Sequence, residues 1–391
     1  MSVTTDPALF LAHTPVYERL NDLSRTQNWY DWAGYLAPGS LDSVEFEYFA
    51  LRNQASLLDV SPMHTYRIQG PEADALLNRV VTRNVTKIRE GRVGYALWCD
   101  EQGMLIDDGT LFHLASNDWR LCCQEPMLGW LLDASWGYDA QITDESHTLA
   151  GFALQGPSAF AVLDSAGFDV SKMRPFDIAH FEEISISRTG FTGDLGYELW
   201  CPWAAALGLW DRLWDGGAHW GLRAIGYEAV NIARIEAGFL AAGVDFQPVH
   251  ATERLHRGAT PFELGLGRLV DFDKGHFNGR RALLAAQKTP RFKLLRVDVE
   301  GFKPANGALI YHGKRREVGH ITSGVWSPTA KRNIALAQVK MPYALHRNPN
   351  LWTEIYTHED GLWRTRWARL TPQRAPFFAP ARARANPPAR T

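Results

Sequence analysis

Two neighbouring acids, Asp107 and Asp108, are the first candidates for chemistry in this chain. They follow a turn at 100–103, inside a stretch (94–123) whose alternating residues predict a β-hairpin. Side chains on a strand alternate between its two faces, so only one of the two acids enters a given cavity, and Ile106 should share the face of Asp108. A carboxylate beside an amine can orient it, accept its proton and stabilise positive charge. Without further context, such a pair is more often a turn or surface feature.

A third acid, Glu198, ends a glycine-rich segment, 187–198, which reads SRTGFTGDLGYE. Its three glycines, Gly190, Gly193 and Gly196, permit an unusual backbone path that would let the chain approach a flat ligand closely. An ionised carboxylate only accepts hydrogen bonds, so Glu198 could bind a group that donates them. A plain glycine hairpin is the alternative.

The composition limits the classes of protein that the chain can represent. Hydrophobic residues make up 46% and charged residues 21% of 391 residues, which is typical of a packed globular protein with two or three domains. Forty-one Lys and Arg oppose 43 Asp and Glu, so we expect neither nucleic acid nor a membrane as partner. No secretion signal or run of eighteen apolar residues is seen, and the four cysteines form no CxxC pair. We therefore expect a cytoplasmic protein without a metal site.

An internal echo indicates two related units. RIQGP (67–71) and ALQGP (153–157) both predict a strand, a turn and a helix that begins at proline. After about residue 290 the pattern changes to short strands, which predicts a separate all-β domain. The tail, 372–391, is rich in Pro, Ala and Arg and is predicted to be disordered.

Together the two acidic segments resemble the aminomethyltransferase family, that of the glycine cleavage T-protein, in which the matching patterns read roughly GGxIDDL and SRTGYTGExGxE. Further matching segments run in family order between about residues 14 and 345. They are Asp59–Met63, Arg234–Gly238, Pro261–Leu266, Gly319–Gly324 and Ser327–Thr329. Each segment alone is weak, but the ordered set is specific.

The resemblance implies an α+β fold, a three-domain ring of the aminomethyltransferase type with tetrahydrofolate in its central opening. Two α+β folate-cavity domains and a C-terminal β-barrel-like domain would form the ring. The expected boundaries are 1–66 with 150–262 for a discontinuous first folate-binding domain, 67–149 for the second, and 290–371 for the barrel.

The resemblance also implies a set of site residues. Asp108 would be the catalytic acid, facing N5 and N10 of tetrahydrofolate, and Glu198 would accept hydrogen bonds from the pterin ring. The expected cofactor-binding residues are Met63, Tyr95, Asp108, Phe191, Glu198 and Arg234. Phe191 stands where the family usually has Tyr.

The sequence departs from the family pattern where a donor could enter. Val230 and Asn231 replace an Arg-Asp pair of the T-proteins whose arginine helps to hold folate, and Arg234 lies one turn further along the same helix face. Pro62 and His64 stand where the family usually has His and Gly. The resemblance therefore supports folate more strongly than it supports a lipoyl-bound aminomethyl donor.

A long connection is the second departure. Residues 247–260 exceed the usual T-protein connection and contain His250 and His256, which with His64 are our candidate substrate-side residues. A solvated surface loop is an equal alternative for this stretch.

We therefore predict a tetrahydrofolate-dependent one-carbon transferase. The leading hypothesis is a demethylase, which moves a methyl or methylene group to N5 from a small donor such as an aromatic methyl ether, a sulfonium compound or a methylamine. The first alternative is the glycine cleavage aminomethyltransferase, with a lipoyl carrier protein as partner. The second is a non-catalytic folate-binding regulator. No GxGxxG opens the chain, so a fused oxidase domain is not expected.

Overall fold

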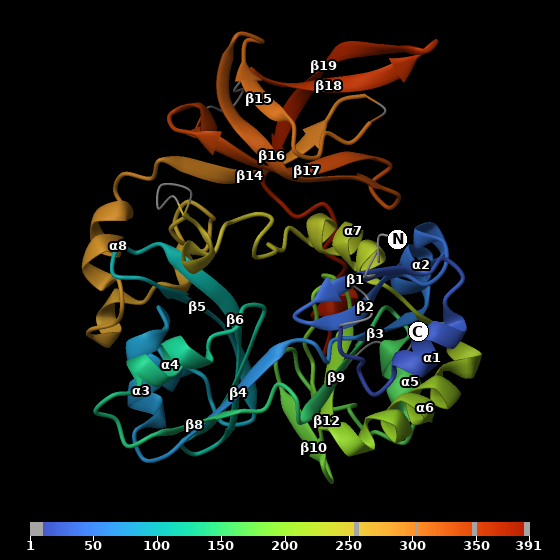
Figure 1. Cartoon of the computed structure of the whole chain (residues 1–391), viewed down its shortest axis with the longest axis vertical. Coiled ribbons are helices and arrows are strands. Elements are labelled where there is room, and N and C mark those ends of the chain that lie inside the picture. The colour runs from blue at the N-terminus through green and yellow to red at the C-terminus, as the bar shows by residue number, and fades with distance from the viewer. Residues whose placement is uncertain (1–10, 254–257, 302, 346–349, 387–391) are drawn as a thin grey trace, which may run out of the picture.

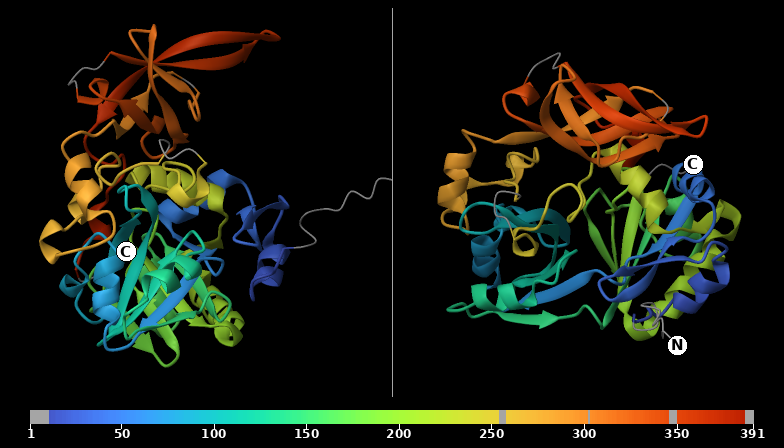
Figure 2. Two further views of the ribbon diagram at one scale, coloured as in Figure 1. Left: turned by 60° about the vertical axis from the view of Figure 1, so that its left-hand side comes forward. Right: turned by 45° about the horizontal axis from the view of Figure 1, so that its top comes forward.

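The chain folds into two helix-covered sheets and a closed barrel. The computed structural model describes residues 11–253, 258–301, 303–345 and 350–386. Figure 1 shows the two sheets side by side with the barrel above them, and Figure 2 shows the barrel lying across the ends of both sheet units. The predicted α+β ring of two α+β units and a C-terminal barrel is confirmed. No helix among the described residues is long and apolar enough to cross a membrane.

The first sheet has the strand order β10-β11-β12-β9-β3-β13. Its strands are β3 (Ala55–Asp59), β9 (Leu149–Gln155), β10 (Ile178–Phe181), β11 (Ile184–Ser187), β12 (Gly196–Pro202) and β13 (Leu222–Ala224). The central strands β3 and β9 are buried on both faces, which explains why their sequences are nearly continuous apolar runs. Associated helices are α1 (Tyr17–Leu23), α2 (Val44–Asn53), α5 (Ala159–Ser165), α6 (Ala206–Gly217) and α7 (Tyr227–Ala237), and β1 (Asn28–Trp32) and β2 (Tyr35–Ser40) form a separate hairpin.

The second sheet has the order β5-β6-β7-β4-β8. Its strands are β4 (His64–Gln69), β5 (Arg92–Cys99), β6 (Leu105–Ala115), β7 (Asp118–Cys123) and β8 (Gln141–Asp144), with helices α3 (Ala73–Val80) and α4 (Leu128–Ala134). Since β4 begins at His64, the chain passes from the first sheet to the second between Asp59 and His64. A domain boundary at 66 would therefore cut through β4.

The third unit is a closed barrel with the order β14-β17-β16-β15-β18-β19. Its strands are β14 (Phe292–Val299), β15 (Leu309–His312), β16 (Arg316–Ser327), β17 (Arg332–Lys340), β18 (Leu351–Glu359) and β19 (Leu362–Gln373), and α8 (Arg280–Ala286) precedes it. Alternate residues point inward and form one apolar cluster that includes Val297, Ile310, Val318 and Ala337.

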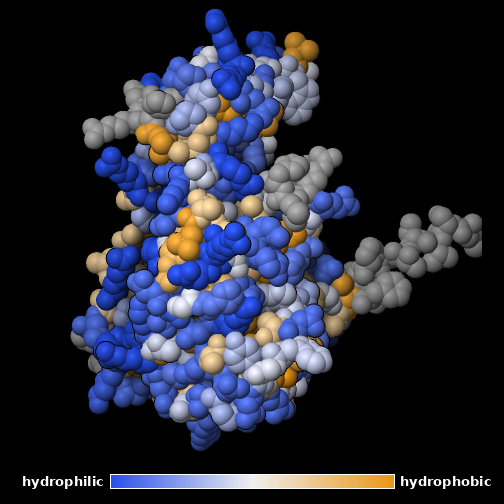
Figure 3. All heavy atoms as spheres, turned by 90° about the vertical axis from the view of Figure 1, so that its left-hand side faces the viewer, coloured by the Kyte–Doolittle hydropathy of each residue, from blue (hydrophilic) through white to orange (hydrophobic). Residues whose placement is uncertain are grey.

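Separate contacts close the ring. Phe112 of the second sheet packs on Trp200 of the first, and Leu97 and Leu105 of the second sheet share a buried cluster with Leu336 of the barrel. The face that carries α3 and α8 is mostly hydrophilic in Figure 3, with small apolar groups scattered over it. Single exposed apolar side chains of this kind are normal on a folded protein.

The predicted disorder of the tail is wrong for residues 372–386. Gln373 still pairs with β14, and the chain then descends from the barrel towards the first sheet unit (Figure 1), where it ends the described range at Asn386. There the Phe378 N–H donates to the Glu236 carbonyl at 3.0 Å. Long-range contacts, rather than apolar composition, order this segment. Residues 387–391 lie outside the described residues.

Candidate functional site

The two neighbouring acids on β6 point to opposite faces of the second sheet. Asp107 lies opposite Trp98 of β5, whose ring belongs to the core of this unit, and no part of the Asp107 residue is exposed. Asp108 lies opposite Leu97, and the Tyr95 hydroxyl donates to its Oδ2 at 2.6 Å. Asp108 is half-buried. The two acids therefore lie on opposite faces, as the alternation of strand side chains predicted, and only Asp108 is partly exposed.

The expectation that Ile106 shares the face of Asp108 is wrong. The register between β5 and β6 shifts between Trp98 and Cys99, so that Ile106 is an extra residue and Leu105 pairs with Cys99. Ile106 consequently packs with Trp98 in the core of the second unit. Such a β-bulge interrupts the alternation of faces, which is why simple alternation fails here.

The surroundings of both acids favour their neutral forms. Burial raises the pKa of Asp108, and the Tyr95 hydrogen bond opposes part of that rise. Burial, and next the charge of Asp108, raise the pKa of Asp107, whose Oδ2 accepts the Glu125 N–H at 3.0 Å. Burial followed by the charge of Asp108 raises the pKa of Tyr95 well above its ordinary value, so Tyr95 remains a hydrogen-bond donor. Ionising one carboxyl makes the other harder to ionise.

Glu198 lies on β12, opposite Ala153 of β9 and Ser187 of β11. Its Oε2 accepts the Thr189 hydroxyl at 2.7 Å, and that hydroxyl lies 2.6 Å from the Ser187 hydroxyl. Burial raises the pKa of Glu198, and the Thr189 bond opposes the rise. The carboxylate is half-buried and has a fixed orientation.

Asp108 and Glu198 lie on the faces of the two sheets that meet. Phe112 is on the Asp108 face of β6, Trp200 is on the Glu198 face of β12, and their rings pack edge to face at 6.4 Å. Cys122 belongs to the same buried cluster, and burial and then the charge of Glu198 raise the pKa of its thiol. The two acids therefore flank one junction between the sheets.

The walls of this junction are apolar on the Glu198 side. Ala153, which pairs with Glu198, shares a buried cluster with Leu58 and Val230, and Met63 packs on the cluster around Trp200. The Trp200 indole N–H is buried and has no hydrogen-bond partner within the described part of the chain. Two carboxylate acceptors, one unpaired donor and apolar walls fit a flat heterocycle that carries N–H groups and ring nitrogens.

An aromatic pair lies at the glycine-rich segment. Phe191 and Phe239, which follows α7, stack with centroids 5.9 Å apart and an interplanar angle of 20°. Each is 38% exposed, so the pair offers an apolar surface to a ligand. Among the predicted site residues, Met63, Tyr95, Asp108 and Glu198 lie at or beside the sheet junction.

Two protein families match the sequence of this chain. The GCVT N-terminal domain family matches residues 16–274, and the glycine cleavage T-protein C-terminal barrel domain family matches residues 291–354. The chain belongs to the glycine cleavage T-protein family. Members of this family are folate-dependent transferases that use tetrahydrofolate.

Known proteins of the T-protein family are similar to this chain over most of its length. An aminomethyltransferase of Caldanaerobacter subterraneus subsp. tengcongensis is 32% identical over 329 residues, 80% of this chain and 84% of the relative. One of Geobacillus kaustophilus is 34% identical over 80% of this chain and 87% of the relative. A trimethylamine-oxide aldolase of Ruegeria pomeroyi is 29% identical over 81% of this chain but 42% of that protein. The crystal structure of aminomethyltransferase T from Bartonella henselae has the same fold, with a TM-score of 0.83, 24% identity and coverage of 94% and 98%.

Arg234, which the T-protein resemblance placed at the folate, has other partners in this structure. It is 1% exposed and forms an ion pair with Asp245, while its Nη2 donates to the Ser323 hydroxyl of β16 at 2.8 Å and its Nε donates to Asn231 at 2.9 Å. Its guanidinium therefore joins α7 to the barrel.

The two candidate substrate-side histidines that the structure describes, His64 and His250, do not lie at the junction. His64 pairs with Cys123 and stacks on Tyr66, both on the core face of the second sheet, whereas the Asp108 face carries Cys122. The prediction fails because strand pairing, which sets the face, is not visible from position alone. His250 is exposed and lies near Asp100 at the hairpin turn. His256 lies outside the described residues.

The three glycines of the 187–198 segment make room for protein rather than for a ligand. A Cβ at Gly190 or Gly196 would lie 2.0 or 2.1 Å from the Gln155 Oε1, and one at Gly193 would lie 2.5 Å from the Ala237 Cβ. Gly193 also has a φ of +73°, which favours glycine. The expectation that these glycines admit a flat ligand is therefore not supported here.

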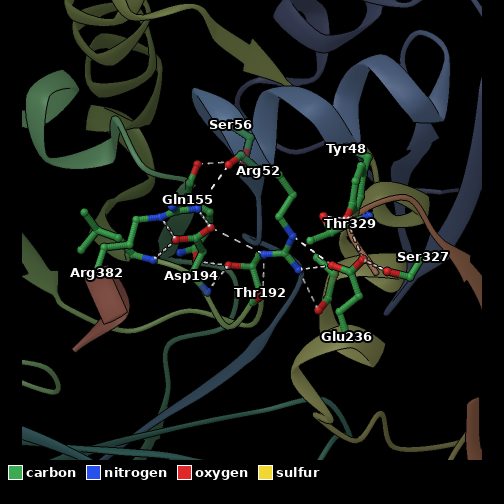
Figure 4. A network of polar contacts seen from close by, with 12 residues as sticks. Tyr48, Arg52, Ser56, Gln155, Thr192, Asp194, Glu236, Ser327, Thr329 and Arg382 are labelled. Carbon is green, nitrogen blue, oxygen red and sulfur yellow. Dashed lines mark hydrogen bonds and ion pairs between the residues drawn. The ribbon is translucent and has the colours of Figure 1, made fainter. Parts of the chain in front are cut away.

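A buried ionic network is a further feature that the sequence did not indicate. Arg52 of α2 donates to Glu236 of α7 at 2.6 and 3.0 Å, and both side chains are at most 3% exposed. Tyr48 donates to the same Glu236 at 2.6 Å (Figure 4). The ion-paired residues are 184 positions apart, and no local pattern links them. The Arg234–Gly238 motif contains Glu236 but does not reveal its partner.

Proposed function

We propose that this protein transfers a one-carbon group from a small donor to tetrahydrofolate, with Asp108 as the acid–base residue. The observation that carries the proposal is the pair of half-buried carboxylates, Asp108 and Glu198, on facing surfaces of the two sheets. Within the described ranges, no ion pair joins a cation to either carboxylate. Burial raises the pKa of both carboxyls, and raised pKa values are typical of functional acids.

Different residues of the chain have different roles in the proposed transfer. Bound tetrahydrofolate supplies the secondary amine that takes up the one-carbon group. Asp108, with a pKa raised towards neutrality, accepts or returns a proton beside that amine, and Tyr95 fixes the orientation of its carboxylate. Glu198 accepts N–H groups from the ligand and is itself held by Thr189. The apolar walls reduce the access of water, which strengthens both interactions.

We propose a donor that carries positive charge, such as a sulfonium compound or a methylated amine. Val230 stands where T-proteins have an arginine, and its side chain lies in the apolar cluster beside Glu198. The acids at the junction therefore lack that positive partner, and a cationic donor would supply it. A neutral aromatic methyl ether would gain less binding energy from these negative charges. The trimethylamine-oxide aldolase relative is named for a methylated nitrogen compound, which agrees with this choice.

The second candidate is the glycine cleavage aminomethyltransferase. It is favoured by relatives of that name at 32% and 34% identity over most of their length. Such homologues work with a lipoyl carrier protein, which would then be the partner here.

The test combines purified protein, tetrahydrofolate and a donor panel with mass spectrometry of the folate product. A methylated folate from a sulfonium compound or methylamine supports the demethylase. A methylene folate and ammonia only from an aminomethylated carrier protein support the second candidate. No folate product from any donor refutes transfer chemistry.

A matched pair of variants tests the role of Asp108. Asp108→Asn should bind tetrahydrofolate but lose about 10²- to 10⁴-fold in rate, the usual contribution of a positioned acid–base group. Glu101→Gln, in the exposed turn of the same hairpin, should retain the rate. Full activity of Asp108→Asn would contradict the assignment. Folate binding without transfer in the unmodified protein would favour the regulator.

A further inference from the structure

The segment after β19, residues 374–386, runs from the barrel back to the first sheet unit and is called the strap below. It is attached to the barrel where Arg296 Nη2 donates to the Arg374 carbonyl at 2.6 Å. It is attached to α7 where the Phe378 N–H donates to the Glu236 carbonyl at 3.0 Å. The strap thus passes directly over the buried network of Arg52 and Glu236.

Arg382 of the strap forms a two-pronged ion pair with Asp194. Its Nε and Nη2 donate to the two Asp194 oxygens at 2.6 and 2.8 Å (Figure 4). The Asp194 side chain is fully buried, whereas that of Arg382 is 29% exposed. Asp194 belongs to the 187–198 segment that ends in Glu198. A bidentate guanidinium–carboxylate pair fixes geometry as well as charge, so Arg382 restrains this segment.

Two further contacts hold the same segment to the strap. The Phe378 ring stacks on the Arg52 guanidinium, 4.0 Å from the ring centroid, while Arg52 Nη1 donates to the Thr192 carbonyl at 2.9 Å. Arg188, at the start of the segment, donates from Nη2 to the Ala385 carbonyl at 2.7 Å. The strap therefore contacts the segment at Arg188 and Asp194, and supports it at Thr192 through Arg52.

A chain of hydrogen bonds leads from this anchor to Glu198. The Thr192 hydroxyl donates to Gln155 Oε1 at 3.0 Å, and Gln155 Nε2 donates to the Thr189 carbonyl at 3.2 Å. Thr189 then donates from its hydroxyl to Glu198. Each step joins neighbouring, buried or part-buried groups. A displacement of Asp194 would consequently change the position of the Glu198 carboxylate, which we assign to ligand binding.

We propose that Arg382 is a positioning residue for the tetrahydrofolate site, and that the strap sets folate affinity by fixing the 187–198 segment. This inference rests on the proposed function, because it assigns Glu198 to folate. The strap anchors the ligand-binding acid and forms no hydrogen bond with Asp108 or Tyr95 in the described ranges. Its loss should therefore weaken binding in the ground and transition states alike, which raises KM and leaves kcat nearly unchanged.

The experiment compares Arg382→Ala, Arg382→Lys and a control, Arg366→Ala, with the unmodified full chain. Arg366 pairs with Glu359 on the β18–β19 hairpin, so the control also removes an arginine–carboxylate pair. We measure the Kd for tetrahydrofolate by calorimetry, KM and kcat with the active donor, and hydrogen exchange of residues 187–198. Arg382→Ala should raise Kd and KM roughly tenfold, with kcat within about twofold and faster exchange of the segment. Arg382→Lys should restore part of the affinity, and Arg366→Ala should change none of these values.

The outcomes separate this inference from the proposed function. If the unmodified protein does not bind tetrahydrofolate, the proposed function is wrong. If it binds folate and Arg382→Ala has the same Kd, the strap has no positioning role. If Arg382→Ala does not fold, Arg382→Lys decides, and an unchanged Kd in that variant overturns the inference. A fall in kcat with an unchanged KM would indicate lost active protein and would also overturn it.

Discussion

Removing the Tyr95 hydroxyl should shift the titration of Asp108. The hydroxyl donates to Asp108 Oδ2 at 2.6 Å, and this bond lowers the pKa that burial raises. Hydrogen bonds to charged groups contribute about 1.5–3 kcal/mol, and one pKa unit corresponds to about 1.4 kcal/mol. Because Tyr95→Phe removes a donor that favours the ionised form, the pKa of Asp108 should rise by about 1 to 2 units.

The shift is measured in the pH dependence of kcat/KM. If ionised Asp108 is the active form, the acid limb of the profile should move to higher pH by the same amount, while the rate at high pH is largely retained. A carbon-13 titration of labelled aspartate carboxyls gives the same pKa without turnover. Tyr356→Phe, at an exposed tyrosine of the barrel, is the control and should leave the limb in place. An acid limb that stays fixed or moves to lower pH in Tyr95→Phe would refute the assignment of Asp108.

Two further predictions concern stability. Asp107 has a pKa raised by burial and by Asp108, so the native protein loses stability as the pH rises from about 4 through that raised pKa. In urea unfolding, the free energy of unfolding of Asp107→Asn minus that of the unmodified protein should therefore increase between pH 5 and 8.5. A difference that is independent of pH would contradict the burial argument. Gly196→Ala places a Cβ 2.1 Å from Gln155 Oε1 and should destabilise by about 1–3 kcal/mol. Gly208→Ala in α6, where nothing lies within 4 Å, should be neutral or stabilising by up to about 1 kcal/mol, and equal losses in both variants would disprove the packing explanation.

Features that depend on neighbouring residues could be predicted from the sequence. The hairpin around 100–103, the late change to strands and the opposite faces of Asp107 and Asp108 all follow from short-range patterns. The order of the family motifs added the α+β ring. These predictions succeeded because periodicity and turn chemistry act over a few residues.

Features that depend on distant partners could not be predicted. Whether His64 faces the core is decided by its pairing with Cys123, and the bulge at Ile106 is decided by the register with β5. Arg234 is turned towards the barrel by Asp245 and Ser323. In each case the deciding contact comes from another strand or unit, which the local pattern does not encode.

The composition of the strap explains the error about the tail. A stretch rich in Pro, Ala and Arg has little apolar surface to bury, so composition predicts disorder. Its order comes instead from Arg382, which finds Asp194 at a separation of 188 residues, and from the stacking of Phe378 on Arg52. A few specific polar contacts are enough to hold a segment that has no core of its own.

The strap also bears on how the protein is made. Domains fold roughly in the order in which they emerge from the ribosome, and the strap follows every other described element in the chain. A nascent polypeptide can therefore fold both sheets and the barrel before Arg382 is available to pair with Asp194 in the 187–198 segment. Ligand affinity would be acquired only after the strap has been synthesised, so incomplete products that end before it would be compact but poor at binding tetrahydrofolate.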